Sequence, residues 1–173
     1  MIPPRQFLQT STDSRNSVRE LIQTIFATEL LSPSRCLWII SPWLRDVPVL
    51  DNTTGSFLTL CPDFPIAEVR LSLVLEELLT RGTQIVIATR PDQGNRQVLE
   101  NLRSTGFEQD LIFHERSELH AKGIVGDSSS LIGSMNFTYN GLERLTEMLV
   151  FQTDRAAVEQ VRLSFRNEYG GRA

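Results

Sequence analysis

Helical periodicity of apolar residues marks four segments of the chain. The first follows a run of N-capping residue types and repeats apolar side chains at Val18, Leu21, Ile22 and Ile25. The second ends at Gly82, a residue type common at helix C-termini. The pattern predicts helices at residues 15–31, 66–81, 95–104 and 156–169.

Short apolar runs between these helices are typical of buried strands. We predict strands at residues 36–40, 84–89, 111–114, 119–125, 130–133 and 148–151. Because strands alternate with helices, the fold class is α/β, with a mixed, mostly parallel central sheet sandwiched by helices in a single domain spanning residues 1–173. Residues 1–10 are expected to form a loose N-terminal arm. Residues 45–66 are expected to form a long loop that borders the functional site.

The composition, with 40% hydrophobic and 22% charged residues, is that of a soluble globular protein. No apolar run reaches the roughly 18–20 residues of a membrane span, and the start of the chain lacks a signal-peptide layout. We therefore expect a cytoplasmic protein without integral membrane association. Cys36 and Cys61 are expected to be free thiols, and neither has neighbours that indicate a zinc site.

The net charge of −4 argues against a large, non-specific nucleic-acid-binding surface. It does not argue against a small positive pocket that binds one phosphodiester.

Lys122 is the single lysine among 17 basic residues, and it lies two positions after His120, one of only two histidines. A lysine ammonium is a compact point charge that a planar guanidinium does not reproduce. Alternation along the predicted strand 119–125 would place the two side chains on the same face, about 7 Å apart. This pair is the first candidate for chemistry.

Further polar residues follow within a short stretch. Ser134 and Asn136 repeat the same two-residue spacing after the next predicted strand. Imidazole, ammonium, hydroxyl and amide groups together suit a tetrahedral oxyanion. The stretch lacks the carboxylate cluster that holds magnesium, so we predict phosphoryl chemistry with no metal and no cofactor.

Two sequence boxes in this stretch resemble the HKD signature of the phospholipase D superfamily. The first is His120-x-Lys122-x4-Asp127, and the second runs from Gly133 through Ser134, Asn136 and Phe137 to Thr138. The likeness is close over residues 111–152 and implies the mixed α/β phospholipase D/nuclease-like fold, while the upstream half agrees only in its order of elements.

The resemblance implies a role for each residue of these boxes. His120 would be the nucleophile that forms a covalent phosphohistidine, and Lys122 and Asn136 would bind the non-bridging oxygens, with Ser134 as a further donor. Glu147 would accept a hydrogen bond from Nδ1 of His120 and so leave Nε2 free to attack. Asp127 would support its loop and not contact substrate.

The implied mechanism needs two imidazoles, one to attack and one to protonate the leaving oxygen. The chain has one motif, and its other histidine, His114, lacks a following lysine. We therefore predict a homodimer in which each subunit contributes His120 to a shared active site, as single-motif members of the family do.

The predicted function is a metal-independent phosphodiesterase, a nuclease or nuclease subunit acting on DNA or RNA, with protein partners aiding substrate recognition. Two alternatives remain open: a phospholipid-acting hydrolase or transferase, and a catalytically quiet assembly subunit.

Structural roles compete with functional ones at several of these positions. Ser134 is also a plausible turn former, and Glu147 a solvated residue at a strand start. His114 is most simply a half-buried strand residue. Trp38 and Trp43 are expected to pack in the core and in a loop, and base stacking by Trp43 has no support in the sequence.

Overall fold

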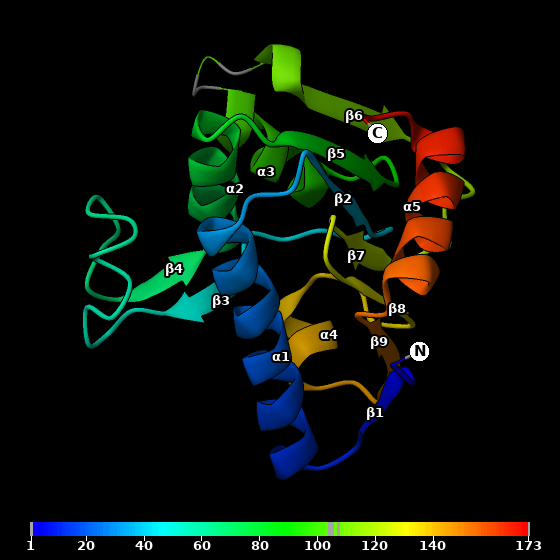
Figure 1. Cartoon of the computed structure of the whole chain (residues 1–173), viewed down its shortest axis with the longest axis horizontal. Helices are drawn as coiled ribbons and strands as arrows, with labels where there is room; N and C mark the ends of the chain where they lie inside the picture. The colour runs from blue at the N-terminus through cyan, green and yellow to red at the C-terminus, as the bar shows by residue number, and fades with distance from the viewer. Residues whose placement is uncertain (1, 104–105, 107, 173) are drawn as a thin grey trace.

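The computed structural model describes residues 2–103, 106 and 108–172, and within them seven strands form one central sheet (Figure 1). In spatial order the strands are β1 (Arg5–Gln9), β9 (Glu147–Gln152), β8 (Ser130–Gly133), β7 (Gly123–Val125), β2 (Cys36–Ile40), β5 (Gln84–Thr89) and β6 (Leu111–Glu115). The helices are α1 (Thr12–Leu31), α2 (Leu71–Thr80), α3 (Gln93–Arg103), α4 (Tyr139–Glu143) and α5 (Arg155–Tyr169), and a 3-10 turn covers Glu108–Asp110.

The sheet has a parallel part and an antiparallel part. β2, β5 and β6 are parallel, whereas β7, β8, β9 and β1 pair antiparallel with their neighbours, and β7 is also antiparallel to β2. The predicted mixed α/β sandwich is confirmed, with more antiparallel pairing than a mostly parallel sheet would have. The reason is the short connection at residues 126–129, because a turn of that length joins only antiparallel neighbours.

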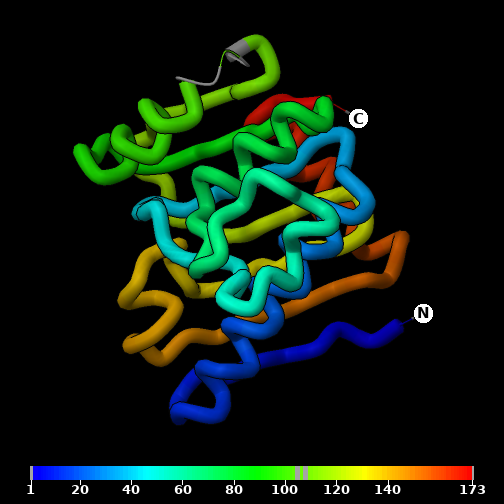
Figure 2. Tube along the Cα trace, turned by 90° about the vertical axis from the view of Figure 1, so that its left-hand side faces the viewer, coloured from blue at the N-terminus to red at the C-terminus, as the bar shows by residue number. Residues whose placement is uncertain are grey.

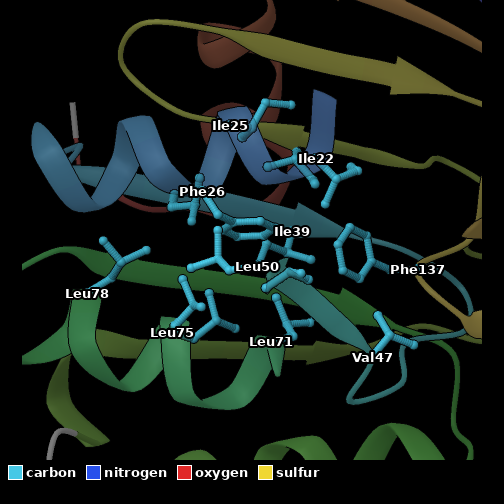
Figure 3. Close-up of a cluster of buried hydrophobic side chains, with 14 of the residues drawn as sticks. Ile22, Ile25, Phe26, Ile39, Val47, Leu50, Leu71, Leu75, Leu78 and Phe137 are labelled. Atoms are coloured by element: carbon cyan, nitrogen blue, oxygen red, sulfur yellow. The ribbon is translucent and has the colours of Figure 1, made fainter. Parts of the chain in front are cut away.

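Alternation along the central strands divides the core into two layers. Leu37 and Ile39 of β2 pack with the helices α1 to α3, and Figure 3 shows Ile39 among the side chains of α1 and α2. Trp38 and Ile40 point to the other face, where Tyr169 of α5 packs. Both faces of β2 and β5 are therefore covered, which explains why these strands are apolar throughout.

The N-terminal segment differs from the expected loose arm. Arg5–Gln9 form the edge strand β1, whose residue Phe7 lies opposite Leu149 of β9 and packs against the core. The side chain of Gln9 is buried and donates to the carbonyl oxygens of Gly141 and Leu142. The segment is too short and polar for the pattern to mark it as a strand, and the unpaired edge of β9 orders it.

Residues 45–66, expected as a long loop, contain the strand β3 (Pro48–Asp51), which pairs with β4 (Glu68–Arg70). This two-stranded excursion protrudes beside α1 in Figure 1 and faces the viewer in Figure 2. Asn52 is buried and orders the loop, accepting from the N–H of Phe57 and donating to the carbonyl of Pro65. Helix α2 starts at Leu71, five residues later than predicted, because β4 occupies the preceding residues.

The two cysteines are free and buried, as expected. Burial raises the pKa of the Cys36 thiol to about 12, so this group remains a neutral apolar core residue.

Candidate active site

The segments that carry the predicted site residues meet at one edge of the sheet. This edge holds the loops that follow β2 and β5, the residues before β7, the loop after β8 and the first residue of β9. In sheets with parallel strands, binding sites form outside the carboxyl ends of the strands. The first box precedes β7 and the second follows β8, and the two boxes meet because these strands pair antiparallel, with Gly123 opposite Ile132.

The strand predicted at residues 119–125 starts only at Gly123. Its neighbour β2 ends at Ile40, which lies opposite Gly123, and the chain then turns at Ser41 and Pro42. Residues before Gly123 thus have no β2 residue to pair with. The alternation that would place His120 and Lys122 on one strand face is wrong for this reason.

Lys122 folds back into the site. Its side chain is only 9% exposed, and its Nζ donates a hydrogen bond of 2.8 Å to the backbone carbonyl oxygen of His120. Burial lowers the pKa of this ammonium and the nearby Arg90 lowers it further, whereas Glu147 acts in the opposite direction. The site therefore holds a desolvated positive charge next to the backbone of the predicted nucleophile.

The side chain of His120 is exposed and lines a pocket with Arg116, Glu168 and Tyr169. Within the described part of the chain it makes no hydrogen bond, so its imidazole is accessible to a ligand. The expected hydrogen bond between His120 and Glu147 is not formed in the single chain.

Glu147 is instead the partner of Ser134. The carboxylate is buried and accepts a short hydrogen bond from Oγ of Ser134, and the same Oγ accepts from the N–H of Met148 over 2.9 Å. Gly133 makes this arrangement possible, because a Cβ there would lie 2.1 Å from the carbonyl oxygen of Met148. Ser134 therefore connects the second sequence box to the start of β9.

The remainder of the second box is held by the loop that follows β2. The N–H of Phe137 donates to Oγ of Ser41 over 3.0 Å, and the N–H of Arg45 donates to the carbonyl of Phe137 over 2.8 Å. Asn136 lies on this segment, and its Oδ1 is buried without a hydrogen-bond partner among the described residues. The group of Asn136 that can donate to an oxyanion is its Nδ2 amide, not this buried oxygen.

Asp127 lies at the opposite end of β7 from His120. Its carboxylate forms a 2.7 Å ion pair with the buried Arg162 and accepts from the N–H of Arg35, and its own N–H donates to Ser34. These contacts tie the turn after β7 to α5 and to the start of β2.

His114 is half-buried in β6, and its Nε2 is 2.7 Å from the carbonyl oxygen of Tyr169. The second histidine of the chain is thus engaged with the end of α5.

Ser41 and Asn95 of this edge carry no functional signal in the sequence, and Arg90 stands there only as one of several arginines that could line a groove or lie on the solvated surface. Asn95 is fully buried and binds four groups: its Oδ1 accepts from the N–H of Leu44 and from Arg45, and its Nδ2 donates to the carbonyls of Pro42 and Arg90. An asparagine near the start of an amphipathic helix usually faces solvent, so only the fold reveals this role.

A family model described as "Cardiolipin synthase, PLD-like domain" matches residues 47–169. The chain belongs to the phospholipase D-like family. This confirms the resemblance drawn from the two sequence boxes, and the match extends well upstream of them.

Several solved structures share the fold over nearly the whole chain. Nuc from Salmonella typhimurium, a phospholipase D family member, has a TM-score of 0.61 at 16% identity, over 98% of this chain and 97% of that one. NucT from Helicobacter pylori has a TM-score of 0.58 at 10% identity, over 95% and 94%. Phosphatidylserine synthase from Haemophilus influenzae has a TM-score of 0.55 at 14% identity, over 95% of this chain and 36% of that chain.

A comparison with curated protein sequences finds no match. Within the described ranges, none of the helices has the length and apolar character needed to cross a membrane.

Proposed function

We propose that this phospholipase D-like protein is a metal-independent phosphodiesterase that cleaves nucleic acid as a homodimer, with His120 as its nucleophile. The observation that carries the proposal is the buried Lys122, whose ammonium holds the backbone of the accessible His120. Ser134, Asn136 and Glu147 lie at the same sheet edge. A fixed positive charge next to an accessible imidazole suits attack on an anionic phosphodiester.

The proposed reaction has two steps. Nε2 of His120 attacks phosphorus, a P–N bond forms, and the P–O bond to the leaving group breaks as a second imidazole donates a proton to the leaving oxygen. Water then attacks phosphorus while that second imidazole accepts its proton, and the P–N bond breaks to restore His120. Lys122 and Asn136 bind the non-bridging oxygens in both steps, and Ser134 is a further donor.

The second imidazole is the reason for the dimer. His114 is bonded to the end of α5, so we assign the second imidazole to His120 of another copy of the chain. The sheet face next to the site offers a surface for that copy, because Leu8 (61% exposed) lies opposite Met148 (52% exposed), the residue after Glu147. Glu147 is buried beside this surface and bound to Ser134 in the single chain, and it is proposed to orient an imidazole once the subunits associate.

Nucleic acid is the proposed substrate class. Two of the structurally similar proteins are Nuc and NucT, and each matches this chain over almost its full length. The similarity to a phosphatidylserine synthase supports the second candidate, a phospholipid-acting hydrolase or transferase, although that chain is much longer.

The test is cleavage of single-stranded DNA, duplex DNA and RNA in excess EDTA by wild type, His120→Ala and His114→Gln. We expect cleavage by wild type and by His114→Gln, in which the amide can still donate to the carbonyl of Tyr169, and none by His120→Ala. Acid-labile, alkali-stable labelling of wild type by a substrate labelled at its internal phosphates would identify the phosphohistidine. Cleavage by His120→Ala, or complete dependence on added metal, would contradict the proposal.

A further inference from the structure

Trp43 is an exposed aromatic residue at the edge of the candidate active site. The chain has two tryptophans, and the other, Trp38, is 1% exposed and donates to the carbonyl of Gly170. Trp43 is 41% exposed, but its backbone is anchored. Its carbonyl oxygen accepts a hydrogen bond of 2.8 Å from Oγ of Ser41. The same Oγ accepts from Phe137, so the loop of Trp43 is connected directly to the segment of Asn136.

Arg90 connects this indole to the predicted nucleophile. Its guanidinium carbon lies 5.3 Å from the centroid of the Trp43 ring. Its Nε donates a hydrogen bond of 2.8 Å to the carbonyl oxygen of Leu119, the residue before His120. Within the described residues no carboxylate pairs with Arg90, whereas Arg45 and Arg116 at the same edge are both ion-paired. Arg90 is therefore a cation whose charge remains available to an anionic ligand.

Asn95 fixes the relative position of the two groups. Its Nδ2 binds the carbonyl of Pro42, the residue before Trp43, and the carbonyl of Arg90 itself, over 2.9 and 2.8 Å. An indole and a guanidinium held together by a fully buried asparagine form a preorganised surface, which reduces the entropy lost when a ligand binds.

We propose that Trp43 and Arg90 form a stacking platform for the base of an unpaired nucleotide next to the scissile phosphate, so that the substrate is single-stranded nucleic acid. This inference rests on the proposed function and specifies its substrate class. Aromatic side chains that stack bases, together with arginine, are the usual means of binding single strands. In a duplex both faces of each base are already stacked, and a phospholipid offers no flat group to the indole.

Binding is measured in the His120→Ala background, in EDTA and at one fixed salt concentration, since phosphate contacts depend on salt. The probes are a fluorescein-labelled thymidine decamer and a decamer of abasic deoxyribose of equal charge. We expect Trp43→Ala to raise Kd for the thymidine decamer about tenfold, Trp43→Phe to raise it less, and neither to change Kd for the abasic decamer. We also expect the thymidine decamer, and not the abasic decamer, to quench the fluorescence emission of Trp43.

Tyr139→Ala is the matched control. Tyr139 is also exposed, and Arg144 lies 5.3 Å from its ring centroid, but it lines a separate pocket with Arg19 and Glu143. This variant is expected to bind both decamers like its parent. Equal loss of affinity in Tyr139→Ala and Trp43→Ala would overturn the platform.

Other outcomes separate the platform from the proposed function. Equal affinity for both decamers, no binding of either, or duplex binding as tight as single-strand binding would overturn the platform. So would Trp43-dependent binding to phosphatidylglycerol vesicles without oligonucleotide binding. Wild-type cleavage with no effect of Trp43→Ala on KM overturns the platform alone, whereas base-dependent binding through Trp43 without any cleavage overturns the proposed function alone.

Discussion

Nζ of Lys122 donates a hydrogen bond of 2.8 Å to the backbone carbonyl oxygen of His120. The two residues that the sequence places in one motif therefore meet through the side chain of Lys122 and the backbone of His120. The bond sets the position of the ammonium and restrains the segment that presents the imidazole.

Lys122→Arg is expected to fold and dimerise normally but to lose about 100-fold in kcat, which is typical for the loss of one positioned oxyanion donor. Lys122 is buried and lines a cavity of only about 10 Å³, so the wider guanidinium cannot take the place of the ammonium. Steady-state kinetics with light scattering checks this, with Lys122→Met as the charge-free comparison. Near-normal turnover in Lys122→Arg would show that the position needs only a positive charge.

The protonation of Lys122 can be observed directly, because a protein labelled with [ε-13C]lysine gives one signal. Burial lowers the pKa of this group below its ordinary value. Because Arg90 adds to the lowering and Glu147 opposes it, we expect Arg90→Gln to raise the pKa and Glu147→Gln to lower it further. An ordinary lysine pKa that neither variant changes would contradict the buried position.

The same depressed pKa affects stability. The folded protein holds this proton less tightly than the unfolded chain, so the unfolded state binds more protons at alkaline pH. The contribution of Lys122 to the free energy of unfolding therefore increases as pH rises between the folded pKa and the ordinary lysine pKa. In urea denaturation, the free energy of unfolding of wild type should therefore increase relative to that of Lys122→Met as pH rises across this range.

Met148→Asp is expected to convert the dimer to a monomer and to abolish cleavage, because it places a charge in the apolar sheet face formed with Leu8. Sedimentation velocity and the EDTA cleavage assay measure the two effects. Ile66→Asp, at a 67% exposed residue of the β3–β4 excursion, is the control and should remain an active dimer. A fully active monomer would refute the shared site.

Asp127→Asn is expected to reduce the free energy of unfolding by about 1–3 kcal/mol, since it removes the charged hydrogen-bond acceptor of the buried Arg162. Its kcat/KM should not change, because Asp127 lies at the far end of β7 from His120. Urea denaturation and kinetics test this, with Asp63→Asn at an exposed position as the control. A large loss of kcat/KM without loss of stability would assign Asp127 to catalysis.

Much of the fold follows from patterns that are local in sequence. The apolar runs of β2 and β5 and the periodicity of α1 and α5 are strong because these elements bury long, continuous surfaces. β1, β3 and β4 leave little trace, since short strands at edges and in excursions depend on the partner that orders them.

The sequence by itself determined the family, the α/β class and the residues of the two boxes, because residue type and spacing carry that information directly. Only the tertiary structure decided that Lys122 turns inward to the backbone of His120, that Glu147 binds Ser134, and that Asp127 serves the opposite end of the sheet. It also joined Trp43, Arg90 and Asn95, which belong to different loops. The physical reason is that hydrogen bonds, burial and the end of a strand ladder depend on neighbours that are distant in sequence, and a linear pattern does not contain them.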